Sequence, residues 1–557
     1  MTPQPLLSRR SLLVRGTLIA SGLAVGLDRG AVGSGVEPVT FAQPLRRPPV
    51  LTGDRIVIHV REALVALKPG PRTRMWTFNG TFPGPTIRRP AGRPLQVTFT
   101  HELGVAAQDL TIHLHGGHNL SRYDGQPDRF VIAPGAAQTY HFDFTEAGAP
   151  ERAGLRWYHD HSHMRTLANV YRGLAGMVLT DDGVDRQLGL PTGPYDVPLM
   201  LTNRVLDENN QLVMPAAASA PADDLLDASA DQLVNGVWRP HLDVEPRPYR
   251  FRLLNAAGFR PYNVRLSNGQ PMQLVGVDGG LLPASQSVDQ VMLGPGERAE
   301  VVVDLSRAAG TAITLESASA TGGTLPRTDP VVAPLMQLRV KRARAASRAV
   351  PSTLRPLPAW VAKLSSLPQR AWVFGLGADT SGGPVWTING RAYDPQRVDA
   401  QPVLDSLETW LFVNASPTAT SHYIHAHDVP FAILSRNGKA PVGTEVGLKD
   451  TFRLDPGEVV IAGTRFSDHT GQFMLHCHML NHEDHGMMTT FAVVSAGSTP
   501  TARAASAVLA ATIADPLHRM CAQQVVALAR DGRPAPASSL RLVTSTAICH
   551  LTNPVGD

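Results

Sequence analysis

The sequence is poor in the residues and runs that several common protein classes require. It has three cysteines in 557 residues and no CxxCH motif, which excludes a c-type haem. It has no basic stripe with interleaved aromatic residues, and its net charge is only +4. Nucleic-acid binding is therefore rejected as a function. Beyond an apolar run at residues 16–27, which is too short to span a bilayer stably, no transmembrane segment is visible.

The chain is instead rich in residues that form turns. Its 46 prolines and 49 glycines favour many turns and short strands over long helices. The hydrophobic content of 43% and the charged content of 18% are typical of globular proteins. The length alone indicates three or four domains rather than one.

Two short markers recur along the chain and indicate a threefold repeat. An Asn-Gly pair follows a strand-like run at residues 79–80, 235–236 and 389–390. A Pro-Gly pair precedes an alternating strand-like run at residues 134–135, 295–296 and 456–457, at equal spacing. A period this long indicates repeated domains and not a solenoid. Short strands separated by Gly and Pro turns predict an all-β fold of three tandem β-sandwiches.

The third repeat contains the segment from Met474 to Met487, interpreted as a strand that runs into a short loop. Successive strand side chains point to opposite faces, so Cys477 faces away from its neighbours His476 and His478. A thiolate on one face suits a soft transition metal, and the two imidazoles suit a second metal site. His482 and Met487 could fold back to the sulfur side.

Three further histidine clusters supply the same kind of ligand. Two are HxH motifs, and the third is an HxxHxH motif whose first histidine differs in parity from the other two and can face the side of Cys477. All of these motifs lie in the first and third repeats, so we expect an interdomain metal cluster where those repeats touch. The middle repeat is expected to space and pack the outer two. The clusters are His113 and His115; His159 and His161; and His422, His425 and His427.

These four motifs, in this order, resemble those of the multicopper oxidases, in particular bacterial spore-coat laccases and bilirubin oxidases. The resemblance covers residues 76–494. It implies three cupredoxin-like Greek-key domains, followed by a short, partly helical C-terminal tail. The expected divisions are a signal peptide at 1–35, domains at 45–188, 189–350 and 365–497, and a tail at 498–557.

The resemblance also implies a set of four copper ions. Eight imidazoles on three ions fit copper better than zinc, which uses three protein ligands and a carboxylate base in a hydrolase. Met488 is adjacent to Met487 and is the alternative axial ligand, although the spacing favours Met487. The implied ligands are His422, Cys477, His482 and Met487 for the type 1 ion; His113 and His425 for the type 2 ion; and His115, His159 and His478 on one type 3 ion, with His161, His427 and His476 on the other.

The activity implied by the resemblance is that of a laccase-like oxidase. Phenolic or aromatic donors would lose single electrons at the Cys477 copper near the surface, with His482 as the edge at which the electrons enter. Dioxygen would be reduced to water at the three-copper cluster. Glu483 and Asp124 are the candidate proton relays, since oxygen reduction consumes protons that copper cannot supply. The alternative interpretation is that both are solvated loop acids.

Two other functions are weighed against this one. A metallo-oxidase for Cu(I), Fe(II) or Mn(II) would need Met or acidic ligands near the type 1 site, but the 14 methionines are scattered and form no Met-rich insert. A copper-free cupredoxin scaffold would have lost its ligands, whereas this chain retains every position. The expected partners are a small reducing substrate and dioxygen, and the chain is expected to be a monomer. Tyr423 and Asp428 depart from the family pattern, which could alter the type 1 loop or the substrate rim.

The two termini carry separate predictions. Arg9 and Arg10 before a short apolar run resemble a twin-arginine export signal, with an ordinary secretory signal as the alternative. Export predicts a periplasmic or secreted protein. The tail has a helical pattern from Asp515 to Gly532, and Cys521 and Cys549 could pair as a disulfide or remain two buried thiols.

Overall fold

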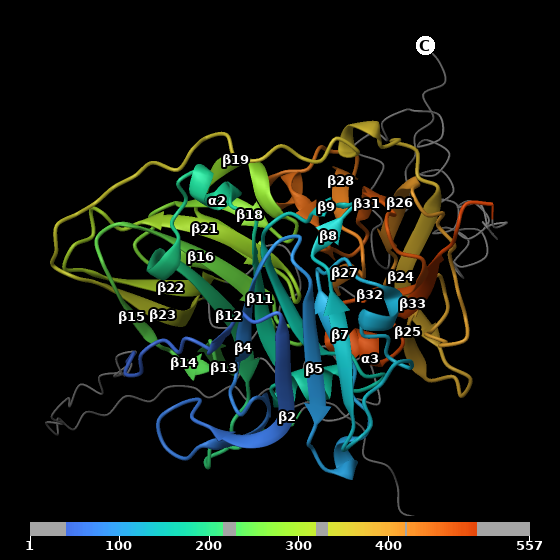
Figure 1. Cartoon of the computed structure of the whole chain (residues 1–557), viewed down its shortest axis with the longest axis horizontal. Helices are drawn as coiled ribbons and strands as arrows, with labels where there is room; N and C mark the ends of the chain where they lie inside the picture. The colour runs from blue at the N-terminus through green and yellow to red at the C-terminus, as the bar shows by residue number, and fades with distance from the viewer. Residues whose placement is uncertain (1–39, 215–229, 319–331, 418–419, 498–557) are drawn as a thin grey trace, which may run out of the picture. The chain divides into compact units, whose positions relative to one another are not determined.

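The computed structural model describes residues 40–214, 230–318, 332–417 and 420–497. The predicted export signal, and the C-terminal tail with its predicted helix and its possible Cys521–Cys549 disulfide, lie outside these residues. In the described part of the chain no helix is both long and apolar enough to cross a bilayer. Figure 1 traces the chain from the blue strands of its first third to the orange strands of its last third.

The first sandwich, residues 50–181, packs two sheets with strand orders β1-β4-β11-β10-β6 and β3-β2-β5-β7. Strands β8 and β9 form a separate short hairpin. The strands are β1 (Val50–Leu51), β2 (Arg55–Val65), β3 (Thr73–Phe78), β4 (Gly84–Pro90), β5 (Leu95–His101), β6 (Ile112–His115), β7 (Ala137–Phe142), β8 (Thr145–Glu146), β9 (Ala149–Pro150), β10 (Leu155–Asp160) and β11 (Ala175–Asp181).

The middle sandwich, residues 196–340, has sheets ordered β14-β13-β12-β16-β21-β18-β19 and β15-β23-β22-β17-β20. Its strands are β12 (Asp196–Arg204), β13 (Asp231–Val234), β14 (Val237–Trp238), β15 (His241–Val244), β16 (Pro248–Asn255), β17 (Tyr262–Leu266), β18 (Met272–Val277), β19 (Gly280–Val288), β20 (Gln290–Leu293), β21 (Arg298–Asp304), β22 (Ala312–Ala318) and β23 (Val332–Val340).

The third sandwich, residues 370–493, has sheets ordered β25-β24-β26-β31-β28-β29 and β30-β27-β32-β33. Its strands are β24 (Arg370–Ala378), β25 (Pro384–Ile388), β26 (Leu407–Asn414), β27 (His422–Ala426), β28 (Phe431–Arg436), β29 (Leu448–Lys449), β30 (Thr451–Leu454), β31 (Val459–Arg465), β32 (Gly471–Cys477) and β33 (Met488–Val493).

Helices are few and short among the described residues, so the predicted all-β class is confirmed. The α-helices are α1 (Thr166–Arg172), α2 (Val184–Gln187) and α3 (Leu480–Asp484). The 3-10 turns are η1 (Val105–Ala107), η2 (Ser121–Tyr123), η3 (Gly193–Tyr195), η4 (Val361–Lys363) and η5 (Gly443–Val446).

The three Asn-Gly markers are tight turns of one geometry. Asn79, Asn235 and Asn389 have φ of 57°, 48° and 54°, and the following glycines have φ of 76°, 68° and 70°. Two successive residues at positive φ are the requirement of a type I′ turn, which Asn-Gly satisfies best. The predicted repeat therefore corresponds to a repeated local structure.

Each sandwich has its own apolar core. Ile58, Val97 and Tyr140 belong to the first core, and Phe251, Val301 and Leu335 belong to the middle one. The third core is the most aromatic, with Trp372, Trp386, Trp410 and Phe412. Cys477 and Met487 are also members of the third core, so the thiol lies among apolar side chains.

The segment after Cys477 differs from its prediction. It contains helix α3 rather than only a loop, and this turn of helix returns His482 toward the sulfur.

Candidate metal centre

Strand pairing in the first sandwich brings its two HxH motifs together. Strands β6 and β10 are antiparallel, and His113 lies opposite His159 in their register. Directly opposite residues share a face of the sheet, so the side chains of both motifs project to one side. His161 follows the end of β10, where its backbone N–H donates to the carbonyl of Thr111 (2.9 Å).

The third sandwich repeats this arrangement with β27 and β32. These strands are antiparallel, with His425 opposite His476 and Ile424 opposite Cys477. The alternation along β32 therefore places His476 on the face of His425 and directs Cys477 to the other face, as its parity predicts.

The imidazoles of the two sandwiches meet in one buried cluster. His113 Nε2 lies 3.3 Å from His425 Nε2, and His161 Nε2 lies 3.3 Å from His476 Nε2. His427 Nε2 is also 3.3 Å from His476 Nε2. The predicted type 2 and type 3 ligands are thus brought together in what is called here the eight-histidine cluster: His113, His115, His159, His161, His425, His427, His476 and His478.

Most of these rings are oriented by a hydrogen bond on the nitrogen that faces away from the cluster. Nδ1 of His113 bonds to the carbonyl of Asp124 (2.6 Å), and Nδ1 of His425 to that of Asp450 (2.9 Å). Nδ1 of His159 and His476 bond to the carbonyls of Asp160 and Cys477. In each ring this leaves Nε2 as the atom that faces the cluster.

His115 is oriented in the opposite sense. Its Nε2 donates to Asp450 Oδ1 (3.0 Å) and lies 3.0 Å from Thr451 Oγ1, while its buried Nδ1 has no protein partner. Its ring stacks on that of His425 with centroids 3.7 Å apart and planes 6° from parallel. Nδ1 is therefore the nitrogen of His115 that is left to bind a metal.

The electrostatics of the cluster keep its imidazoles neutral. Burial, together with the neighbouring imidazoles, lowers the pKa of His113, His427 and His478 well below the ordinary histidine value. Burial lowers the pKa to about 3 at His161 and to about 4 at His425. A neutral imidazole offers a lone pair, which is the form that ligates a metal.

The third core contains a second group of candidate ligands, His422, Cys477 and His482, and the predicted axial Met487 is buried in the same core. These four residues are called here the mononuclear site. Cys477 Sγ lies 3.7 Å from His422 Nδ1 and 3.6 Å from His482 Nδ1, and the two nitrogens are 3.1 Å apart. The backbone N–H of Tyr423 donates to the sulfur (3.4 Å). Met487 is fully buried in the same core, and its carbonyl accepts the N–H of Cys477 (3.1 Å).

Aromatic packing excludes solvent from the mononuclear site. The ring of Trp386 lies over that of His482 with centroids 4.2 Å apart, and it meets His422 edge-on at 5.2 Å. His482 has 0% relative exposure, so an electron that enters at its edge has to pass through the residues that cover the ring.

Both candidate relay acids lie inside the protein and not in solvated loops. Asp124 is fully buried and accepts from Nδ1 of His427 (2.7 Å). Glu483 accepts from the hydroxyl of Thr166 (2.6 Å), and its second oxygen lies 3.3 Å from Nδ1 of His476. Burial raises the pKa of both carboxyls well above the ordinary values, with Asp484 adding to the shift at Glu483.

The departure at Asp428 has a structural role. Its carboxylate oxygen lies 3.0 Å from Nδ1 of His118 and 3.1 Å from Nδ1 of His469. Asp468 contacts Nε2 of His118 (3.0 Å). Burial opposes protonation of His118, but the two carboxylates outweigh it and raise its pKa well above the ordinary value. This charged cluster ties the loop after β6 to the third sandwich.

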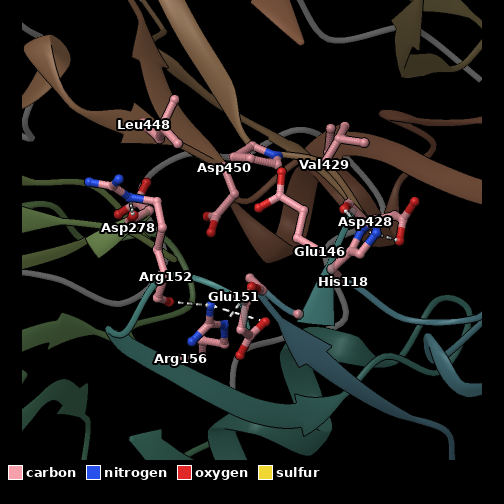
Figure 2. A pocket seen from close by; sticks show the side chains of 15 residues that line it. His118, Glu146, Glu151, Arg152, Arg156, Asp278, Asp428, Val429, Leu448 and Asp450 are labelled. Carbon is pink, nitrogen blue, oxygen red and sulfur yellow. Dashed lines mark hydrogen bonds and ion pairs between the residues drawn. The ribbon is translucent and has the colours of Figure 1, made fainter. Parts of the chain in front are cut away.

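A small polar cavity lies beside the eight-histidine cluster (Figure 2). It has a volume of about 40 Å³, which is room for a few water molecules. Asp450, the hydrogen-bond partner of His115, lies on its wall with Glu151 and Arg156, which form an ion pair (3.2 Å). Burial raises the pKa of Glu151 to about 7. The cavity, which Gly116 also lines, thus provides space for a few waters next to His115 in the sequence.

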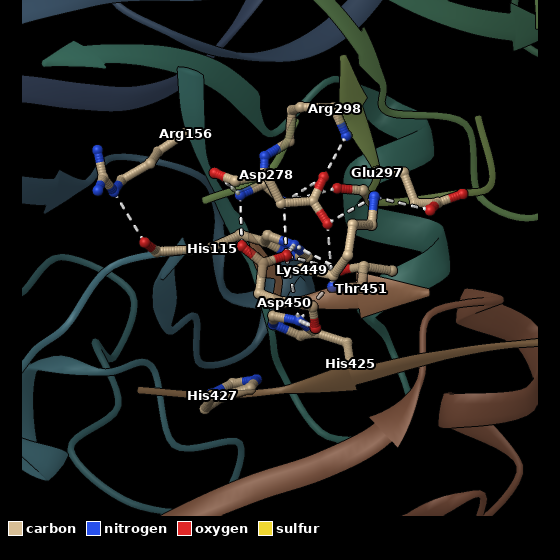
Figure 3. Close-up of polar contacts among 12 residues, drawn as sticks. His115, Arg156, Asp278, Glu297, Arg298, His425, His427, Lys449, Asp450 and Thr451 are labelled. Carbon is tan, nitrogen blue, oxygen red and sulfur yellow. Dashed lines mark hydrogen bonds and ion pairs between the residues drawn. The ribbon is translucent and has the colours of Figure 1, made fainter. Parts of the chain in front are cut away.

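The residues that hold the outer nitrogen of His115 were not predicted from the sequence. Figure 3 draws Asp450 together with His115, Arg298, Asp278 and Lys449, and Asp450 accepts from both His115 and Arg298. Two signals could have indicated them. Asp450 belongs to a Lys-Asp-Thr run that enters a strand of the third repeat. Arg298 is charged at a position after the Pro-Gly marker where the other two repeats have Ala137 and Val459.

The donor atoms fit copper. Two imidazole nitrogens that bind one ion at about 2.0 Å with a tetrahedral angle lie about 3.3 Å apart, as several pairs here do. Buried His115 Nδ1, His159 Nε2 and both nitrogens of His478 have no protein partner, and such atoms call for a ligand. Imidazole and thiolate donors with a thioether nearby are the set that copper prefers.

Comparisons with known proteins agree with this donor set. Sequence profiles described as multicopper oxidase match residues 59–184, 209–320 and 367–497. The chain is 33% identical to a laccase of Bacillus subtilis over 474 residues, covering 75% of this chain and 90% of the relative. It is 32% identical to a bilirubin oxidase of Albifimbria verrucaria over 437 residues, covering 74% of this chain and 72% of the relative.

A solved structure shows the same architecture. The multicopper oxidase of the hyperthermophile Aquifex aeolicus superimposes with a TM-score of 0.71 and 28% sequence identity. The match covers 82% of this chain and all of that chain. The three sandwiches are therefore cupredoxin-like domains.

Proposed function

This chain belongs to the multicopper oxidase family, and on that premise we propose that it is a laccase-like enzyme acting on phenolic or aromatic donors. Each donor loses one electron, and dioxygen takes up four electrons and four protons to give two waters. The observation that carries the proposal is the coexistence of the mononuclear site and the eight-histidine cluster, joined through the contiguous residues His476, Cys477 and His478.

We propose the ligand groups as follows. One copper is held by the mononuclear site, and three are held by the eight-histidine cluster: one by His113 and His425, one by His115, His159 and His478, and one by His161, His427 and His476. Bound copper would supply the one-electron redox chemistry and the affinity for dioxygen, while the protein supplies ligand geometry and protons.

The part of the chain between the two groups supports electron transfer. Cys477 belongs to one group and its two covalent neighbours belong to the other, so a short backbone path links them. His476 Nδ1 also contacts the Cys477 carbonyl (3.1 Å), which adds a hydrogen bond beside the covalent path. Cys477 and His482 are the electron-transfer residues of the proposal.

Protons reach the cluster from buried carboxyls in this proposal. The support is that one oxygen of Glu483 lies 3.3 Å from His476 Nδ1, while its other oxygen accepts from the Thr166 hydroxyl. Asp124 accepts from His427 Nδ1. Both acids therefore lie against rings of the cluster, near the place where dioxygen would be reduced, and a general acid has to reach the atom that it protonates directly or through one water.

The test begins with copper-loaded protein. We expect four coppers per chain, an intense blue thiolate band, and oxygen uptake with phenolic donors. Fast oxygen uptake with Cu(I), Fe(II) or Mn(II) and none with phenols would instead identify the metallo-oxidase. A colourless protein that binds no copper would refute the oxidase and support the copper-free scaffold.

We also propose export by the twin-arginine route, with action outside the cytoplasm as a monomer. The support is the Arg9-Arg10 pair before a short apolar run. Replacing both arginines with lysine should retain the protein in the cytoplasm, as measured by cell fractionation. Export that continues in this variant would favour the ordinary secretory signal.

A further inference from the structure

We infer that the middle sandwich is a working part of the metal cluster, with Arg298 as a positioning residue that orients His115 through Asp450. The inference rests on the proposed copper sites and adds a residue from the one domain that contributes no ligand. Arg298 is the first residue of β21 and has 0% relative exposure.

The ion pair between Arg298 and Asp450 is bidentate. Arg298 Nη1 donates to Asp450 Oδ1 (2.6 Å), and Nη2 donates to Oδ2. A bidentate pair of this kind fixes the plane of the carboxylate as well as its position. The oxygen that Nη1 holds is the one that accepts from His115 Nε2 (3.0 Å).

The consequence for His115 is a fixed tautomer and a fixed ring plane. Among the eight histidines, His115 is the one whose Nε2 bonds to a carboxylate, which leaves Nδ1 toward the cluster. A carboxylate on the outer nitrogen orients a ligating ring and raises its basicity. Arg298 therefore acts on the ligand without touching it.

Arg298 itself is held by all three sandwiches. Its Nε donates to the carbonyl of Leu155 in the first (3.0 Å), and Nη1 donates to that of Gly296 in the middle (3.0 Å). Nη2 donates to the carbonyl of Asp278 (3.3 Å) as well as to Asp450 in the third. All five N–H donors of the guanidinium are used, so its position is fully specified.

The turn before Arg298 forms a wall of the cluster. Gly296 has φ +86°, and a Cβ there would lie 2.9 Å from His478 Cγ and 3.0 Å from His115 Cε1. The equivalent glycine of the first repeat, Gly135, has nothing within 4 Å of such a Cβ. The same turn is thus open to space in one sandwich and packed on two imidazoles in another.

The repeat also shows that Arg298 is not needed by the turn. Arg298 is the third residue after the proline of its Pro-Gly pair, and the equivalent positions of the first and third repeats hold Ala137 and Val459. Strands begin close to the turn in all three repeats. The guanidinium therefore serves the contact with Asp450 and not the local strand geometry.

A conservative variant with a matched control tests the inference. Arg298→Lys keeps the charge but replaces the planar fork with a point charge that cannot hold both carboxylate oxygens. The control is Arg250→Lys, because Arg250 is equally buried in the middle sandwich and pairs with Asp185 and Glu300, away from the histidines. Copper affinity is measured on the full chain by titration against a competing chelator, with the blue thiolate band followed separately.

We expect Arg298→Lys to weaken copper binding by the cluster about 10–100-fold, the usual effect of losing an outer hydrogen-bond partner, and to leave the thiolate band unchanged. Arg250→Lys should leave both readouts unchanged. Gly296→Ala keeps every ion pair, but it crowds His115 and His478 and also strains the turn at φ +86°. If Arg298→Lys does not fold, loss of cluster copper in Gly296→Ala with an intact thiolate band supports the inference, and wild-type cluster affinity contradicts it.

Two results would overturn the inference. One is wild-type copper affinity of the cluster in Arg298→Lys. The other is a parallel loss of cluster copper and thiolate band in both arginine variants, which would indicate general stabilisation of the fold. Failure of the proposed function is distinct, since the wild-type protein itself would then bind no copper.

Discussion

The mononuclear site and the eight-histidine cluster are built in different ways. The residues of the mononuclear site come from one sandwich and lie in its aromatic core beside Trp386. The histidines of the cluster come from two sandwiches and have three carboxylates against them: Asp124, Asp450 and Glu483. The mononuclear site is enclosed by apolar side chains of one domain. The cluster is polar, and its histidines come from segments that are far apart in the sequence.

The difference matches the chemistry proposed for each region. Electron transfer needs fixed ligands and little rearrangement, and a close-packed core provides both. Oxygen reduction consumes protons, so the cluster needs acids within hydrogen-bond reach. We therefore expect substitutions in the two regions to separate copper content, colour and turnover.

The largest effect is expected from Cys477→Ser, which removes the sulfur shared by the two mononuclear histidines. The blue band should disappear, one copper should be lost, and oxygen uptake with phenols should fall to background, because a hydroxyl is a poor ligand for a soft metal. Elemental analysis should show the cluster copper retained. Loss of all copper would mean that the two regions are not independent.

The next largest effect is expected from Glu483→Gln, which keeps the shape but removes the transferable proton. Turnover should fall by about 10²–10⁴-fold, the usual contribution of a general acid. Copper content and the blue band should remain. Asp128→Asn, at a partly exposed carboxylate beside Tyr393, is the control and should have near-wild-type turnover. Unchanged turnover in Glu483→Gln would remove this residue from the proton path.

A smaller effect is expected from Asp124→Asn, because the hydrogen bond on Nδ1 of His427 would be weakened and not lost. Losing an outer partner of a ligand typically reduces metal affinity or activity about 10–100-fold. The change should appear in chelator titrations of the cluster, with no change in the blue band. A variant with altered colour and intact cluster affinity would contradict this assignment.

The smallest effect is expected from Trp386→Phe at the mononuclear site. Trp386 lies over His482 and meets His422, and such aromatic contacts contribute about 0.5–1.5 kcal/mol each. We expect a slightly lower free energy of unfolding and a shift of the blue band, with unchanged copper affinity in the cluster. A denaturant titration and a visible spectrum measure both. A changed copper affinity of the cluster with an unchanged blue band would contradict the assignment of Trp386 to the mononuclear site.

Strand parity and the Asn-Gly turns are local properties, and they made much of the fold, and the faces to which the histidines and Cys477 point, predictable. His113 opposite His159, and His425 opposite His476, follow from alternation along single strands once those strands pair. The short helix after Cys477 was not predicted, because a single turn of helix has too few residues to show a period.

The sequence by itself determined which histidines share a face and that Cys477 faces the other way, because side chains alternate along a strand. The tertiary structure alone decided what holds those ligands. Arg298 and Asp450 are separated by 152 residues, and Thr166 and Glu483 by 317, so no local pattern links them. Such contacts form only when separate sandwiches pack together and bury polar groups that must find partners, and this is why the middle sandwich takes part in a site to which it gives no ligand.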